Sequence, residues 1–130
     1  MTDTLEIKQE AGKVVVLHLA GQLDGQSEGM LLDEARRVHE TGARYLLIDL
    51  TELEMLTSAG LRAFHDIFKL FTPLEEITAW EKETRGEPYK SKYFKLAGAN
   101  SKIYYVLNLA GFLHNIPIYA DLKEGLASFH

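Results

Sequence analysis

The chain has 130 residues, of which 46% are hydrophobic and 25% charged, a balance typical of one domain with a sizeable core and not of a disordered segment. Its 14 Lys and Arg against 19 Asp and Glu give a formal net charge of -5, so it lacks the basic surface that binds nucleic acid or anionic lipid. The absence of cysteine excludes disulfides, a thiol nucleophile and cysteine-based zinc sites. With no apolar run near the roughly 20 residues that span a bilayer and no signal-peptide core at its start, we expect a cytoplasmic protein without contact to a membrane.

The hydrophobic pattern predicts four to five strands and about four helices. In chain order these are a strand at residues 4–10, a strand at 14–19, a helix at 27–41, a strand at 45–50, a helix beginning at 57–58, a strand at 93–97, a helix after 100–101, a short strand at 116–119 and a closing helix from 121. The second and third strands are nearly continuous apolar runs, as in strands covered on both faces. We therefore expect an α/β fold in a single domain over residues 1–130, with a mixed, mostly parallel sheet and helices packed against it.

Local signals mark the ends of these elements. Residues 21–27 carry turn chemistry, and residues 51–56 are predicted as a loop before the second helix. Gly42 is expected just past the end of the first helix, and Asn100 and Asp121 are expected to cap the starts of two later ones.

Residues 72–92 depart from the pattern, because they are charged and irregular around the single tryptophan, Trp80. We expect an excursion from the domain here, with room for a short helix. The closing helix after it is expected to bury Leu122, Leu126 and Phe129.

A search for catalytic motifs finds none. Leu56 stands where a Gly-x-Ser-x-Gly nucleophile elbow around Ser58 needs its first glycine, and neither a phosphate-binding loop nor a dinucleotide loop occurs. His18, inside an apolar strand, is typical of a core or partly exposed histidine. Asp49, at a strand end, is expected to bond to the following loop. We expect a non-enzymatic protein with no cofactor and no metal.

Thr57 and Ser58 stand at the start of the second helix and allow two interpretations. As an N-cap, a hydroxyl accepts a bond from a free backbone N–H, which contributes on the order of 1 kcal/mol. As a switch, an exposed hydroxyl there receives a phosphate, which the positive end of the helix tolerates and a docked partner does not. Spacing alone favours the cap.

Three segments, the second of which contains this helix start, occur in a set order along the chain. They are VVLHLAGQLD at residues 15–24, LLIDLTEL and LTSAGL at 46–53 and 56–61, and VLNLAGF, IPIY and LKEGL at 106–112, 116–119 and 122–126. In this order they resemble the STAS domain, the anti-sigma-factor antagonist family, over most of the chain apart from residues 72–92. The resemblance implies a small α/β domain with helices packed on a mixed sheet.

The resemblance also implies a role in partner switching. An unmodified antagonist captures an anti-sigma factor that is also a serine kinase, which frees a sigma factor; phosphorylation ends the capture and a cognate phosphatase restores it. Carried over by motif, Ser58 is the phosphoacceptor. Thr57 stands where the family pattern has Asp, and this departure leaves Thr57 itself open as a less favoured alternative acceptor. The implied docking surface comprises Asp24, Gly25, Ser27, Thr57, Ser58, Ala59 and Gly60, with Gly60 letting the helix start approach the partner.

Two other functions remain open at this stage. The Thr57 departure and the excursion at residues 72–92 favour a constitutive scaffold, which pairs with itself or serves a signalling or transport complex without phosphorylation. The helix start alone favours a binder of small molecules or nucleotides.

Overall fold

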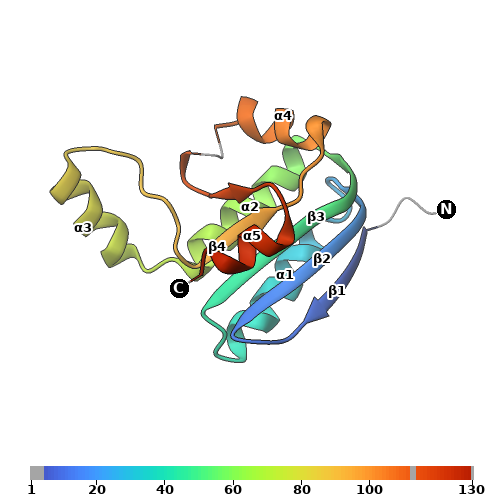
Figure 1. Ribbon diagram of the computed structural model, residues 1–130, viewed down its shortest axis with the longest axis horizontal. Helices are drawn as coiled ribbons and strands as arrows, with labels where there is room; N and C mark the ends of the chain where they lie inside the picture. Colours follow the sequence, from blue (N-terminus) through green and yellow to red (C-terminus); the bar gives the residue numbers. More distant parts are fainter. Residues whose placement is uncertain (1–4, 112–113, 130) are drawn as a thin grey trace.

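The computed structural model describes residues 5–111 and 114–129. Outside the described residues lie Thr4 of the first predicted strand, Phe112 of the motif at residues 106–112, and His130 at the end of the predicted domain. Within the described part, five strands form one mixed sheet and five helices pack around it, which confirms the predicted α/β class (Figure 1). In chain order the elements are β1 (Leu5–Glu10), β2 (Val14–Leu23), α1 (Glu28–Glu40), β3 (Tyr45–Leu56), α2 (Ser58–Phe71), α3 (Leu74–Thr84), β4 (Phe94–Ala97), α4 (Ser101–Leu109), β5 (Ile118–Tyr119) and α5 (Leu122–Ala127).

The strands lie side by side in chain order, β1-β2-β3-β4-β5. β1 pairs with β2 antiparallel, and the other three neighbouring pairs are parallel. Because the parallel strands run in one direction, their carboxyl ends share one edge of the sheet. The starts of α1 and α2 therefore meet at that edge.

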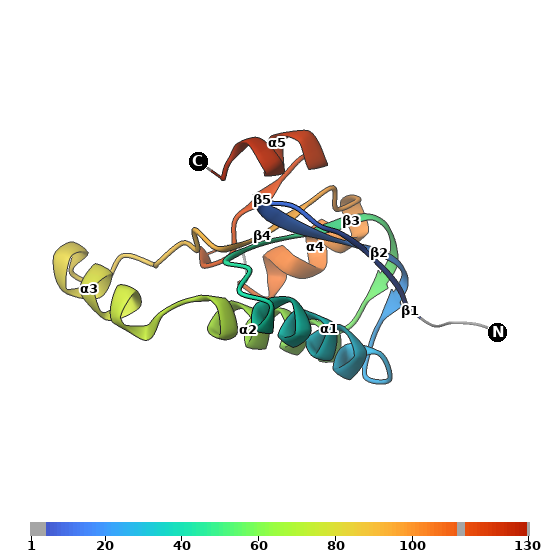
Figure 2. The same cartoon turned by 90° about the horizontal axis from the view of Figure 1, so that it is seen from below.

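The helices cover the two faces of the sheet unequally (Figure 2). α1, α2 and α4 lie on one side, where the main core forms around side chains such as Leu17, Ile48 and Phe64. α5 lies on the other side, over a small cluster made by Val16, Leu47, Ala97 and Phe129. The main core therefore holds α2 against the sheet, and α2 begins at the candidate phosphoacceptor.

The two central strands are longer than predicted. β2 continues to Leu23 and β3 to Leu56, so the predicted loop at residues 51–56 and the start of the predicted turn at 21–27 are strand instead. Leu23 pairs with Leu56, and between His18 and Gln22 the pairing shifts twice, because β3 has an extra residue at each irregularity. Each extension supplies the backbone partners of the other, a long-range effect that local turn residues do not reveal.

Helix ends are where the local predictions hold. The Asn100 Oδ1 accepts from the Ile103 N–H at 2.9 Å, and the Asp121 Oδ1 accepts from the Glu124 N–H at 2.8 Å, so both are N-caps. Gly42, past the end of α1, has φ of 96°. These contacts lie within a few residues of each other in the chain, so sequence alone was enough to predict them.

The prediction for α5 was wrong at Leu126, which is 39% exposed. Gly125 faces the sheet in its place, and a Cβ built on it would lie 3.1 Å from the Leu47 side chain and 3.2 Å from Ala97. The helix packs through its smallest residue because it approaches the sheet so closely.

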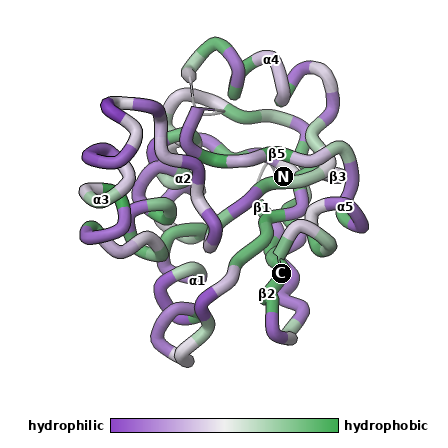
Figure 3. The backbone as a smooth tube through the Cα atoms, turned by 60° about the vertical axis from the view of Figure 1, so that its left-hand side comes forward, coloured by the Kyte–Doolittle hydropathy of each residue, from purple (hydrophilic) through white to green (hydrophobic). Residues whose placement is uncertain are grey.

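The predicted excursion carries its own helix, α3, which projects away from the sheet (Figure 1). Hydrophilic residues make up much of α3 (Figure 3), and none of its residues is buried. Across residues 5–111 and 114–129, no helix combines the length and apolar character needed to cross a bilayer.

Candidate functional site

The candidate site lies where β2 and β3 end and where α1 and α2 begin. The Thr57 N–H donates to the Leu23 carbonyl at 3.1 Å, which ties the start of α2 to the end of β2. A Cβ built on Gly25 would lie 3.6 Å from the Ala59 Cβ, so the loop at residues 24–27 touches the first turn of α2. The structure therefore brings together the two segments that the sequence analysis proposed as one surface.

The loop at residues 24–27 holds its shape through its own polar groups. The Asp24 Oδ1 accepts from the N–H groups of Gln26 at 3.0 Å and Ser27 at 3.2 Å. The Ser27 Oγ donates to the Gln22 carbonyl at 2.9 Å and accepts from the Asp24 N–H at 3.0 Å. Ser27 is only 6% exposed, so it shapes the loop from within and does not stand on the docking surface as predicted.

Gly60 has a packing role that the sequence analysis did not predict. A Cβ at this position would lie 2.6 Å from the Leu23 carbonyl oxygen and 2.8 Å from side-chain carbons of Leu23 and Leu56. Gly60 is buried. The glycine therefore lets α2 approach its own strands closely, and this packing fixes the position of the residues before it.

The two adjacent hydroxyls differ in accessibility. Ser58 is exposed and is the first residue of α2. The Thr57 Oγ1 is buried and has no hydrogen-bond partner within the described part of the chain. Thr57 is the N-cap residue, yet its side chain makes no cap hydrogen bond, so the predicted capping by hydroxyl is wrong for Thr57.

The charges around Ser58 come from residues that the sequence analysis did not single out. α2 has no acidic residue in its first turn, and Arg62 lies one turn after Ser58. The Arg62 guanidinium donates from Nε to the Glu28 Oε2 and from Nη2 to the Oε1, each at 3.2 Å. The four-residue spacing from Ser58 is a signal that could have identified Arg62. Its pairing with Glu28, 34 residues away, could not be seen in the sequence.

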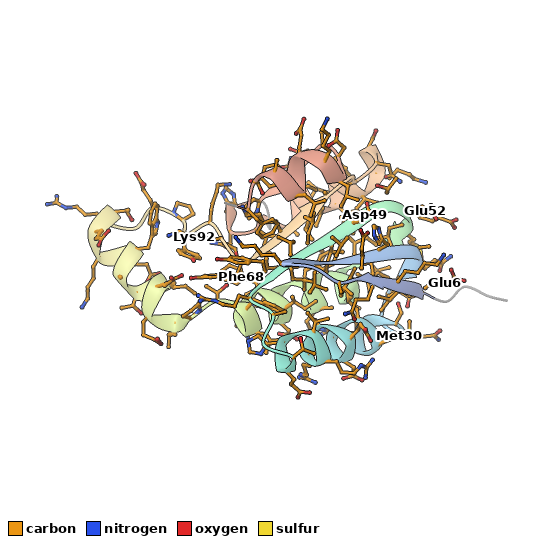
Figure 4. All side chains as sticks on the ribbon, turned by 60° about the horizontal axis from the view of Figure 1, so that its bottom comes forward. Glu6, Met30, Asp49, Glu52, Phe68 and Lys92 are labelled. Carbon is orange, nitrogen blue, oxygen red and sulfur yellow. The ribbon has the colours of Figure 1, made fainter. Side chains whose placement is uncertain are left out.

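Two exposed methionines flank this surface. Met55, near the end of β3, is 38% exposed, and Met30, in the first turn of α1, is 42% exposed (Figure 4). Flexible, polarisable methionine side chains are common on surfaces that bind other proteins. The site therefore combines the exposed Ser58 hydroxyl, the ion pair of Arg62 with Glu28, and exposed methionine side chains.

A second polar cluster lies on the sheet face opposite α1 and α2. The Asp49 Oδ1 accepts from the Thr51 N–H at 3.0 Å, which confirms the predicted bond to the following residues. The Asp49 Oδ2 lies 2.7 Å from the His18 Nδ1, and the His18 Nε2 lies 2.9 Å from the Glu10 Oε1. Beside it is a shallow hollow of about 190 Å³, whose lining includes Glu6 and Glu52 (Figure 4).

Two groups of this cluster, His18 and Asp49, have shifted pKa values. The hydrogen bond to Glu10 raises the pKa of His18 above its usual value, burial opposes this, and the bond to Asp49 adds to it. Burial by itself raises the pKa of Asp49, but hydrogen bonds from Thr51 and His18 outweigh it and lower that pKa overall. A protonated His18 between two carboxylates is consistent with both directions.

Comparisons with known proteins bear on the family and the fold. A family model for the STAS domain matches residues 6–74. Among solved structures, an anti-sigma factor antagonist from Mycobacterium paratuberculosis superposes with a TM-score of 0.78 at 21% identity, covering 99% of this chain and 97% of that one. No curated protein matches the chain significantly.

Two other solved structures illustrate the range of similar proteins. The phosphorylated form of the Bacillus cell fate determinant SpoIIAA has a TM-score of 0.61 at 13% identity, covering 97% of this chain and 99% of that one. A sulfate transporter family protein from Wolinella succinogenes has a TM-score of 0.63 at 16% identity, covering 90% of this chain and 84% of that one. At such identities the likeness establishes a shared fold alone.

Proposed function

The chain belongs to the STAS domain family, and from this membership we propose that it is an anti-sigma-factor antagonist that works by partner switching. It is a non-enzymatic cytoplasmic regulator of bacterial transcription. Its unmodified form binds an anti-sigma factor that is also a serine kinase, and phosphorylation of Ser58 ends that binding. A cognate phosphatase restores the unmodified form.

The exposed Ser58 hydroxyl is the observation that carries this proposal. In the modification step the Ser58 Oγ forms a bond to the γ-phosphorus of ATP, the bond to the ADP leaving group breaks, and the hydroxyl proton passes to a base of the kinase. A kinase needs an accessible hydroxyl, and the neighbouring Thr57 Oγ1 is buried. The accessibility of the two hydroxyls therefore favours Ser58 over Thr57 as the acceptor.

The effect of the phosphate follows from where it is placed. A phosphoserine adds about -1.5 to -2 charges at neutral pH. At the first residue of α2 it lies at the positive end of the helix, so the fold accommodates it. A partner that covers the same surface has to desolvate that charge, which costs several kcal/mol when it is not compensated.

The proposed docking surface combines the exposed and half-exposed parts of the site. These are Asp24, Gly25, Thr57, Ser58 and Ala59, with Ser27 and Gly60 supporting them from below. An interface of roughly 1,200–2,000 Å² in total is enough for a specific complex. A surface of that size extends past these residues onto Met30 and Met55.

Affinity capture from a lysate of the native source tests the proposal. The baits are the wild-type chain, Ser58→Ala, Ser58→Asp and the control Ser101→Asp, which alters an exposed serine at the first position of another helix, α4. We expect wild type, Ser58→Ala and Ser101→Asp to recover a serine-kinase-type anti-sigma factor. We expect Ser58→Asp to recover at least about tenfold less of it, equivalent to about 1.4 kcal/mol. Equal recovery by Ser58→Asp and wild type contradicts the proposal.

A constitutive scaffold is the second candidate, and α3 favours it. Trp80 and Leu74 of this projecting helix are 36% and 71% exposed, which offers a partner apolar contacts far from Ser58. A STAS-like fold in a sulfate transporter family protein is compatible with this role. Loss of a complex on deleting residues 72–92, with no effect of Ser58→Asp, supports the scaffold.

A further inference from the structure

We infer that Arg62 binds the phosphate of phosphorylated Ser58, and that Glu28 is thereby released from its ion pair with Arg62. The inference rests on the proposed function for the modification itself. It adds a residue that binds the phosphate, Arg62, and a second position, Glu28, at which the charge of the surface changes.

The ion pair between Arg62 and Glu28 joins the first turn of α1 to the second turn of α2. Two guanidinium nitrogens face two carboxylate oxygens at 3.2 Å each. The Arg62 side chain is 65% exposed and that of Glu28 is 27% exposed. Exposed pairs of this kind are only weakly stable, so Arg62 can exchange one anion for another at little cost.

Arg62 is also within reach of Ser58. The two residues are four apart on α2, so their Cβ atoms lie about 5–6 Å from each other on one face of the helix. Long helical side chains lean toward the N-terminus, which directs Arg62 toward Ser58. The Glu28 carboxylate contacts the same guanidinium from α1.

A phosphate at Ser58 is a stronger partner for Arg62 than Glu28 is. It carries about -1.5 to -2 charges and three acceptor oxygens, whereas a carboxylate carries one charge. Guanidinium groups bind phosphate through paired hydrogen bonds. The first turn of α2 contains no acidic side chain that would compete for Arg62.

The exchange has a consequence for the docking surface. In the unmodified chain, the surface presents a neutral hydroxyl and a balanced ion pair. In the phosphorylated chain, it presents a phosphate paired with Arg62 and, on α1, a Glu28 carboxylate without its cation. Negative charge therefore appears at both helix starts, and a bound partner is repelled across the whole seam between α1 and α2.

A phosphorus NMR titration of the phosphate tests the inference without a kinase or a partner. The protein is the full chain with phosphoserine inserted at position 58 during translation, so the result does not depend on whether Ser58 is a natural acceptor. The matched variants are Arg62→Gln, Arg62→Lys and Glu28→Gln. The control is Arg36→Gln, which removes an exposed arginine of α1 that pairs with Asp33.

An ordinary phosphoserine has a second pKa of about 6. We expect this pKa to be higher in Arg62→Gln than in wild type by at least about 0.3 pH unit, the size of an exposed charge pair one helical turn apart. Arg62→Lys should fall between the two, Glu28→Gln should lower the pKa further, and Arg36→Gln should match wild type. Because Arg62 is exposed, these variants are expected to fold.

Indistinguishable titrations of wild type and Arg62→Gln overturn the inference. The proposed function fails separately, through equal capture of the anti-sigma factor by wild type and Ser58→Asp. A shifted titration with no effect on capture leaves Arg62 as the phosphate-binding residue and removes partner switching. If the phosphate pKa is the same in all variants but Ser58→Asp captures less anti-sigma factor than wild type, partner switching stands and Arg62 is not the phosphate-binding residue.

Discussion

At the start of α2 a glycine packs directly against two strand ends, whereas α3 buries none of its residues. Polar side chains contribute much of what holds α3 in place. The Glu76 carboxylate accepts hydrogen bonds from the hydroxyls of Tyr89, at 3.1 Å, and Tyr93, and the Trp80 Nε1 donates to the Glu87 carbonyl at 2.9 Å. The start of α2 is held by close packing, whereas α3 is held by these hydrogen bonds together with apolar contacts of Ile77, which is only partly buried against the main core.

The family match stops at residue 74, the first residue of α3, and α3 itself buries none of its residues against the sheet. Changes in α3 therefore leave the geometry around Ser58 intact, since few contacts connect the two regions. Changes at Gly60 act on the site and on the fold together.

Gly60→Ala is expected to have the largest effect, because the added Cβ would meet the Leu23 carbonyl at 2.6 Å. Forcing extra atoms into a packed site costs roughly 1–3 kcal/mol, and contact with the backbone places this change at the upper end. Urea unfolding measures the loss.

Gly29→Ala is the matched control for this prediction. It lies in a helix too, but a Cβ there meets nothing within 4 Å. We expect its stability to be unchanged or to rise by about 0.5 kcal/mol, because alanine favours helices more than glycine does. Equal stability of the two variants would show that Gly60 does not hold α2 in place.

Glu76→Ala tests the polar contacts that hold α3 and is expected to have an intermediate effect on stability. Burial and the bond to Glu76 raise the pKa of Tyr89, and the bond to Glu76 raises the pKa of Tyr93, which shows how closely the carboxylate is held. Loss of these bonds should destabilise the α3 region by about 1–2 kcal/mol. Hydrogen exchange should increase over residues 74–92 and stay unchanged over 57–71.

Glu83→Ala is the control, because this acidic residue is on the same helix and exposed to solvent. It should leave exchange unchanged. If Glu76→Ala instead accelerated exchange around Ser58, the two regions would be coupled and the comparison would be wrong.

His18→Gln is expected to have the smallest effect, and one that depends on pH. Because the pKa of His18 is raised in the folded chain, its contribution to stability is complete below the unfolded value of about 6.5 and disappears as the pH rises through the folded value. The cluster is partly open to solvent, so the contribution is at most about 1 kcal/mol.

Urea unfolding at about pH 6 and about pH 9 measures this contribution, with pH values chosen on either side of the shifted titration. Wild type should exceed His18→Gln in stability only at the lower pH. Glu10→Gln should reduce the difference, because the bond to Glu10 is the largest cause of the shift. A difference that is equal at both pH values would contradict a charged His18.

Much of the fold could be predicted from the sequence because its signals are local. The caps by Asn100 and Asp121 join atoms three residues apart, and the positive φ of Gly42 follows a helix end. The position of Ser58 at the start of a helix was predicted in the same way. Each of these depends on side chains and backbone groups within about one helical turn.

The sequence by itself determined the order of strands and helices and the hydroxyl at the start of α2. Only the tertiary structure decided that β3 continues through residues 51–56, that Gly60 faces its own strands, and that the Thr57 hydroxyl is buried while that of Ser58 is open. It also decided the pairing of Arg62 with Glu28. The reason is that these features join segments about 30 residues or more apart, and such contacts exist only once the sheet has brought the strand ends together.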